Sequence, residues 1–95
     1  MISHLEANAL YDLYGELLSA RQREVLELYF QEDLSLQEIQ ENLEISKAAV
    51  YDALKKGIAA MEHFEEILHL MARTKKLQEF LEDHPQYEQE LGSLL

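Results

Sequence analysis

Apolar residues recur along most of this chain at intervals of three and four positions, the period of a helix with one buried face. Strand signals are missing, because no β-branched run alternates with polar residues and no Asn-Gly or Asp-Gly turn occurs. A length of 95 residues suits one folded unit. The pattern therefore predicts an all-α fold and a single helical domain over residues 1–95.

The first two helices are predicted over Leu5–Leu17 and over Ala20 to about Gln31. Ser19 and Gln22 have the spacing of a capping box, in which each side chain accepts from the backbone N–H of the other. The apolar residues that recur at helical spacing in the first helix are Leu5, Ala9, Leu10, Leu13, Tyr14 and Leu17. The apolar face of the second consists of Val25, Leu26, Leu28, Tyr29 and Phe30.

Two further helices follow with only Glu44 and Ile45 between them. Ser35 and Glu38 form another capping box before the first, and Ser46 is a favourable N-cap for the second. The apolar positions Leu36, Ile39 and Leu43 fall at helical spacing in the first. The residues expected to face the core in the second are Ala49, Val50, Leu54 and Gly57. Helices joined by so short a turn cross steeply, which leaves one edge of the second exposed. This is the layout of a helix-turn-helix, whose second helix enters the major groove of DNA.

No capping signal in the sequence would end the helix after Ser46 early. Its apolar residues alternate by four and three positions, as in a coiled-coil seam. They are Val50, Leu54, Gly57, Met61, Phe64, Leu68 and Met71. We therefore expect one helix over Lys47–Met71, with a bend near Gly57 as an option. The seam is expected to pack on the first helix of the chain and, in part, on a second protomer in a homodimer. Packing entirely within the chain is the alternative.

Residues 72–95 are predicted to be a C-terminal helical extension, outside a helix-turn-helix core of residues 19–61. One helix is expected over about Thr74–Glu82, with Leu77, Phe80 and Leu81 on its apolar face. Pro85 fits the first turn of a short last helix that is capped near Asp83 or His84. The residues from Gly92 onward are expected to fray.

Charge complicates a role in DNA binding. The chain has 8 basic and 19 acidic side chains, a net charge of −11, which opposes attraction to a polyanion. Residues 24–45 hold seven acids and no base, whereas residues 46–61 hold Lys47, Lys55 and Lys56 against Asp52 alone. A second basic cluster is formed by Arg73, Lys75 and Lys76. It is either a binding feature or an ordinary solvated helix face.

Other classes of function find little support. Cysteine is absent, which excludes disulfides and thiolate metal sites and agrees with a cytoplasmic location. We expect no membrane contact, because no apolar run approaches the roughly 20 residues of a membrane helix. Glu66 and His69 have the spacing of one di-iron ligand unit, but its second unit is missing, so a solvated face is favoured. No catalytic residues, cofactor or metal are expected.

The layout of residues 19–61 resembles region four of bacterial sigma factors and the LuxR-type DNA-reading domains. The shared elements are an aliphatic helix ending in Leu-Tyr-Phe, an Asp-Leu-Ser-Leu-x-Glu-Ile helix and a Ser-x-x-Ala-Val start of the reading helix. A longer stretch, residues 5–76, resembles the YlxM-like family. The matching positions are Asn8, Leu10, Tyr14, Leu17 and Leu18, Arg21 and Gln22, Glu27 to Tyr29, Asp33, Ser35, Leu36, Glu38 and Ile39, Ser46, Lys47, Ala49 to Asp52, Lys55 and Lys56, and Phe64, Glu65 and Leu68.

The resemblance implies a sigma-like helix-turn-helix protein that binds double-stranded DNA and regulates transcription. Genes of that family lie beside those for signal recognition particle components, which implies a part in that pathway. Carried over to this chain, the nucleic-acid-binding residues are Ser46, Lys47, Ala48, Tyr51, Asp52, Lys55 and Lys56. The alternative is an interaction module with little DNA affinity that binds a protein or RNA of the signal recognition particle.

Within this set, Lys47 and Tyr51 are expected to approach bases, and Lys55 and Lys56 to hold phosphates. Tyr51 could instead be a half-buried residue that stabilises the turn. The family has Gln where this chain has Ala48, so one bidentate base contact, worth about 1–3 kcal/mol of discrimination, is missing. Apolar residues 58–60 also stand where sigma factors have several Arg and Lys residues, so this helix alone is expected to bind weakly. Dimerisation would partly compensate by doubling the contacts.

Overall fold

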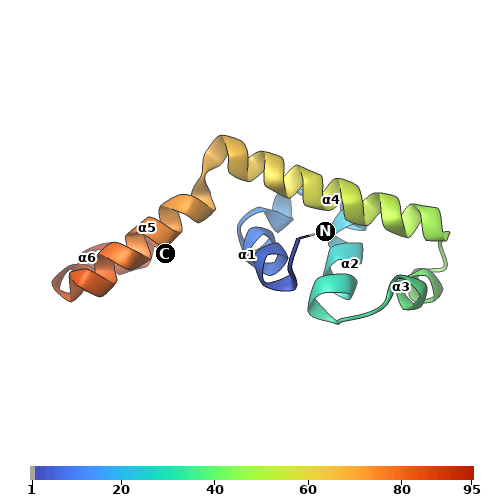
Figure 1. Cartoon of the computed structure of the whole chain (residues 1–95), viewed down its shortest axis with the longest axis horizontal. Helices are drawn as coiled ribbons and strands as arrows, with labels where there is room; N and C mark the ends of the chain where they lie inside the picture. The colour runs from blue at the N-terminus through green and yellow to red at the C-terminus, as the bar shows by residue number, and fades with distance from the viewer. Residues whose placement is uncertain (1) are drawn as a thin grey trace.

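The computed structural model describes residues 2–95, and it confirms the all-α fold (Figure 1). The α-helices are α1 (His4–Tyr14), α2 (Ala20–Leu26), α3 (Leu36–Leu43), α4 (Lys47–Leu68), α5 (Leu70–Asp83) and α6 (Glu88–Leu91). Single 3-10 turns cover Gly15–Leu17, Pro85–Tyr87 and Gly92–Leu94, and a π-helical turn covers Glu27–Gln31. The molecule is elongated, with extents of 52 × 24 × 20 Å.

Two regions differ in how they are packed (Figure 1). In the body, residues 2–68, α4 lies across α1, α2 and α3 and shares one core with them. In the arm, residues 70–95, α5 runs away from the end of α4 and the last turns fold back along it. The buried core of the body consists of Ala7, Leu10, Tyr14, Leu18, Val25, Leu26, Phe30, Ile39, Val50, Ala53, Leu54, Ile58 and Met61.

The predicted starts of α2, α3 and α4 are confirmed. The Ser19 hydroxyl accepts from the Gln22 N–H at 3.2 Å, and the Gln22 side chain accepts from the Ser19 N–H at 3.1 Å. Ser35 and Glu38 form the same reciprocal pair. Ser46 accepts from the backbone at the third residue of α4, as an N-cap does. These caps need only residues three apart, so the sequence alone could predict them.

The seam of α4 is buried as far as Met61, within the chain. A Cβ atom on Gly57 would lie 2.9 Å from Cδ1 of the buried Leu26, so this glycine permits the close crossing of α4 over α2. The helix continues through Gly57 without a break. The prediction that Ala49 faces the core is wrong, because it precedes Val50 by one residue, about 100° around the helix, and is exposed.

The prediction of one helix over Lys47–Met71 is wrong at its C-terminal end. The helix stops at Leu68, and His69 adopts a left-handed conformation with φ of 55°. A new helix, α5, starts at Leu70 instead of near Thr74. The seam therefore does not continue, and Leu68 is 41% exposed. The predicted homodimer contact through this helix stays untested, but the buried part of the seam is already used inside the chain.

The start of α5 is held by side chains from α1 and α4. The Glu65 carboxylate accepts from the N–H of Met71 at 2.8 Å and of Ala72 at 3.2 Å. The Tyr14 hydroxyl donates to Glu65 at 2.6 Å and accepts from the N–H of Leu70 at 3.2 Å. These contacts satisfy amides that a helix start leaves free. Local sequence did not predict this break, because the groups that cap α5 are Tyr14 and Glu65 instead of the N-cap residue His69.

The arm is built on a small apolar contact. Its turns at Pro85–Tyr87 and α6 bring the chain back so that Leu81 is only 5% exposed. Pro85 occupies the first position of its turn, as predicted, with His84 before it. The residues from Gly92 on do not fray but form a 3-10 turn. Phe80 stays 40% exposed, with its ring stacked on that of His84 at 4.2 Å between centroids.

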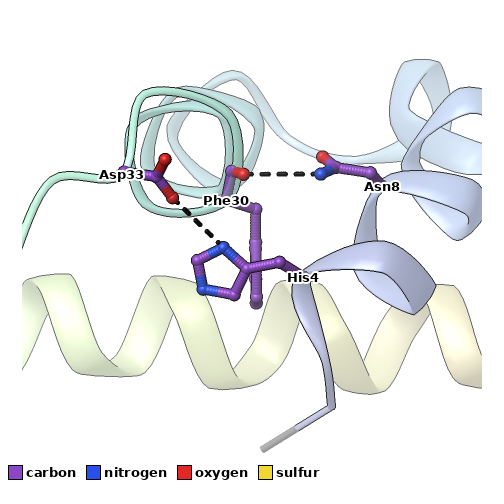
Figure 2. A network of polar contacts seen from close by, with 4 residues as sticks. All are labelled: His4, Asn8, Phe30 and Asp33. Carbon is purple, nitrogen blue, oxygen red and sulfur yellow. Dashed lines mark hydrogen bonds and ion pairs between the residues drawn. The ribbon is translucent and has the colours of Figure 1, made fainter.

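The first helix is joined to the end of the π-helical turn by polar contacts (Figure 2). Asn8 donates from Nδ2 to the carbonyl of Phe30 at 3.4 Å, and His4 Nδ1 lies 3.3 Å from Asp33 Oδ1. The predicted helices over Leu5–Leu17 and Ala20–Gln31 thus exist, but each ends in a turn of different pitch. That change was not predicted, since apolar spacing does not report the hydrogen-bonding pattern.

Candidate nucleic-acid interface

The turn between α3 and α4 sets the geometry of the candidate site. Glu44 takes a left-handed conformation with φ of 55°, and the N–H of Ile45 donates to the carbonyl of Gln40 at 3.3 Å. Ile39 of α3 is fully buried in the core that Val50 and Leu54 of α4 enter. The turn and this contact fix α3 against α4, so the exposed edge of α4 is held by a rigid support.

All seven predicted binding residues lie on exposed surface at the start of α4. They are Ser46, Lys47, Ala48, Tyr51, Asp52, Lys55 and Lys56. The opposite side of the same helical segment carries Val50, Ala53 and Leu54, which are buried. The structure therefore brings the predicted set together on one free edge. Ala49 shares this exposure, contrary to the prediction that it faces the core.

Positive charge on this edge is partly neutralised. Lys56 Nζ lies 3.2 Å from Asp52 Oδ2 in an i,i+4 pair, whereas Lys47 and Lys55 form no ion pair with residues 2–95. The first turn of α4 contains no acid, so its N-terminal partial charge stays positive. Two free lysines and a helix N-terminus thus face solvent together.

The neighbouring helix α3 has the opposite character. It exposes Glu38 and Glu41 and carries no basic residue, and Glu44 follows at its end. Hydrogen bonds from the backbone N–H and hydroxyl of Ser35 lower the pKa of Glu38, so it stays charged. In a helix-turn-helix the first helix crosses the DNA backbone. These carboxylates would repel phosphate there, which limits affinity.

Tyr51 is the one large apolar side chain on the edge. Its ring is 50% exposed, and among residues 2–95 its hydroxyl makes no hydrogen bond. With Ile58, Ala59 and Glu62 it borders a shallow hollow of about 330 Å³ farther along α4. Sequence reasoning missed this hollow, although the spacing of its residues along one helix face was a signal. The exposure of Tyr51 leaves its ring and hydroxyl free to meet a partner.

The arginines of α2 lie outside the predicted set of binding residues. Arg21 is exposed and lies 3.6 Å from Glu24, while Arg23 is partly buried. The described part of the chain contains no group of three or more side chains that could hold a metal, and Glu66 and His69 are both exposed. No helix over residues 2–95 is both long and apolar enough to cross a bilayer.

Helix α4, the tight turn and the capped helix α3 together define an all-α helix-turn-helix protein. The chain matches the family UPF0122, described as "Putative helix-turn-helix protein, YlxM / p13 like", over residues 1–92. It therefore belongs to that family, as its resemblance to YlxM-like sequences predicted.

Relatives in several bacteria carry the same family name. A UPF0122 protein of Clostridium kluyveri is 43% identical over 79 residues, which cover 83% of this chain and 71% of that protein. One from Halalkalibacterium halodurans is 42% identical over 78 residues, covering 82% and 72%. One from Acetivibrio thermocellus is 50% identical over 66 residues, covering 70% of this chain and 56% of that protein.

Proposed function

We propose that this protein is a DNA-binding regulator that places the first half of α4 in the major groove. The observation that carries the proposal is the exposed edge Ser46–Lys56, which holds three lysines on a helix fixed by a tight turn. An α-helix fits the major groove, and lysines on its flank can contact phosphates. No cofactor and no reaction are needed for this role.

Five residues of the edge have distinct parts in the proposal. Lys55 and Lys56 contact phosphates, and Lys47 and Tyr51 approach base edges. Ala48 offers only a methyl group, which suits a thymine methyl and gives little discrimination. Base reading by this edge is therefore weak, and most of the affinity comes from phosphate contacts, which salt weakens steeply.

The proposal is tested by fluorescence anisotropy with duplex DNA from a random-sequence selection. Replacing both phosphate lysines, as Lys55→Ala/Lys56→Ala, is expected to reduce the slope of log affinity against log salt by about 2. Tyr51→Phe and Lys47→Ala are expected to change the selected sequence more than the salt slope.

A matched control separates the effect of net charge from the effect of the two lysines on α4. Gln89→Glu/Ser93→Asp also makes the chain more negative by two charges, but at exposed positions in the arm. This variant is expected to bind DNA nearly as the original chain does. Equal loss in both variants would mean that net charge, not the edge of α4, governs binding. A selection without an enriched motif at low salt contradicts base reading.

A second candidate function is favoured by the acidic surface of α3 beside the edge. This function is an interaction module of the signal recognition particle pathway that binds a protein or RNA of that particle. A protein partner would tolerate the acidic surface better than duplex DNA would, whereas RNA would meet the same repulsion as DNA. The hollow beside Tyr51 offers a partly apolar contact for a protein side chain. Pull-down with the particle's GTPase and its RNA, at a salt concentration where DNA is bound, separates the two functions. If the chain retains neither the GTPase nor the RNA, the second candidate function is excluded.

A further inference from the structure

Helix α5 carries its charges in two separate halves. The first half contains Arg73, Lys75 and Lys76, and the second contains Glu79, Glu82 and Asp83. All six side chains are exposed, and none of them forms an ion pair with residues 2–95. The second basic cluster of the sequence is therefore one end of a dipolar helix with unused charges at both ends.

This order of charges does not serve the helix itself. Anions near a helix N-terminus and cations near its C-terminus are favourable, and α5 has the reverse order. A lysine that precedes a glutamate by four residues, as Lys75 precedes Glu79, is also the weaker of the two orders. The stability of an isolated α5 does not explain the pattern, and the charges remain available to a partner of complementary charge.

The same helix has a stripe of apolar residues, interrupted by Arg73 and ending at His84, that residues 2–95 cover only in part. Leu70, Arg73, Leu77, Phe80 and His84 follow one another by three and four residues, as in a short coiled-coil seam. Leu70 is 37% and Phe80 is 40% exposed. Other sides of α5 are already occupied, by the C-terminal turns over Leu81 and by α1 near the start of the helix.

We propose that α5 is a self-association surface, on which α5 of a second copy of this chain packs in the antiparallel direction. In that arrangement Lys76, which flanks the stripe, comes near Asp83 of the second copy, and two-fold symmetry repeats the pair. Lys75, Glu79 and Glu82 lie on the side of α5 away from the stripe and act only at longer range. A parallel pair would set like charges against each other. The complementary halves lie on the same helix, so the partner that fits them is a second copy.

The stripe on α5 also supports an antiparallel pairing of the two helices. With the two-fold axis near Leu77, the two Leu77 side chains meet at the centre of the pair. Arg73 then comes beside Phe80 of the second copy, where a guanidinium and an aromatic ring attract each other. Two helices of 14 residues bury less than the roughly 1,200 Å² of a standard interface, so a weak dimer is expected.

This inference goes beyond the proposed function and does not depend on it. The dimer contact lies on the arm instead of on the seam of α4, whose buried half already packs against α1, α2 and α3. The edge Ser46–Lys56 stays free in each copy. A dimer would therefore offer two such edges, whether their partner is DNA, RNA or protein.

Sedimentation equilibrium on the full chain, over a wide range of protein concentration, tests the pairing. The original chain is expected to show a monomer–dimer equilibrium. The triple variants Arg73→Glu/Lys75→Glu/Lys76→Glu and Glu79→Lys/Glu82→Lys/Asp83→Lys are each expected to be monomeric. Their equimolar mixture is expected to form a heterodimer, which also shows that both variants keep α5 folded. The chain with all six reversals is expected to form a homodimer again.

Direction is tested with single cysteines, since the chain has none of its own. Under oxidation Leu77→Cys is expected to cross-link, whereas Leu70→Cys is not, because two such sites lie about 21 Å apart along an antiparallel pair. Cross-linking at Leu70→Cys overturns the antiparallel direction. A monomer at every concentration, a dimer that survives both triple reversals, or association only after DNA or another protein is added overturns self-association through α5.

Discussion

The body and the arm are both helical, but they reach their structure by different means. In the body, α4 shares a continuous core with α1, α2 and α3, and Tyr14, Leu54 and Met61 are completely buried. In the arm, Leu81 is the only residue of residues 70–95 that is buried to a comparable degree. The arm depends instead on the hydrogen bonds that Tyr14 and Glu65 make to the start of α5. Equal helix content therefore does not mean equal local stability.

The largest effect is expected from the core of the body. Leu54→Ala removes a completely buried side chain and is expected to lower the free energy of unfolding by about 3 kcal/mol. Leu81→Ala removes an almost equally buried leucine from the arm and is expected to leave the unfolding midpoint of the body nearly unchanged. Urea denaturation followed by circular dichroism measures both. Equal shifts would show that the two regions unfold as one unit.

The second largest effect on stability is expected at the junction between α4 and α5. Glu65→Gln weakens a charged acceptor that serves two amides and the Tyr14 hydroxyl, and it is expected to cost about 2 kcal/mol. Hydrogen exchange should accelerate at Leu70–Ala72 by far more than in α2. Glu66→Gln, an exposed neighbour with the same change of charge, is the control. Unchanged exchange at the start of α5 in Glu65→Gln would contradict the role of this carboxylate.

The same carboxylate predicts a dependence on pH. Partial burial opposes its ionisation, but hydrogen bonds from Tyr14, Met71 and Ala72 outweigh that effect and lower the pKa of Glu65 from 4.5. Because the folded pKa is lowered, the stabilisation is complete above about pH 4.5 and is lost as the pH falls through the folded value. The original chain is expected to lose stability over this interval more steeply than Glu65→Gln. Parallel curves of unfolding free energy against pH would exclude the effect.

The smallest effect on stability is expected at the surface of α4. Asp52→Asn breaks an exposed pair with Lys56 and is expected to change the free energy of unfolding by less than about 0.5 kcal/mol. It removes the one acid of the edge, so DNA affinity is expected to rise while stability stays level. Thermal unfolding and anisotropy on the same sample measure the two quantities. A clear loss of stability would mean that this pair supports the fold.

The comparison also shows what the sequence could predict. The caps at Ser19, Ser35 and Ser46 and the buried positions Val50 and Leu54 follow from neighbours within four residues, and all were predicted. The break at His69 was not, because it depends on Tyr14, which lies 56 residues before the amide that it contacts. The coiled-coil spacing continued across the break and concealed it.

The candidate site also combines features that could be predicted from the sequence with features that were not predicted. Its lysines and its exposed edge could be predicted from local charge and helix spacing. The hollow beside Tyr51 and the pairing of Asp52 with Lys56 were not predicted, although both involve residues three or four apart on one helix. The acids of α3 were visible in the sequence, but their place beside the edge follows only from the fold.

The most direct test of the account is an NMR titration of the labelled chain with duplex DNA at low salt. The account predicts that the amide shifts concentrate at Ser46–Lys56, while the outer face of α1 and the C-terminal turns of the arm remain unchanged. Saturation of the chain with DNA without shifts in Ser46–Lys56, or with shifts confined to the arm, would contradict it.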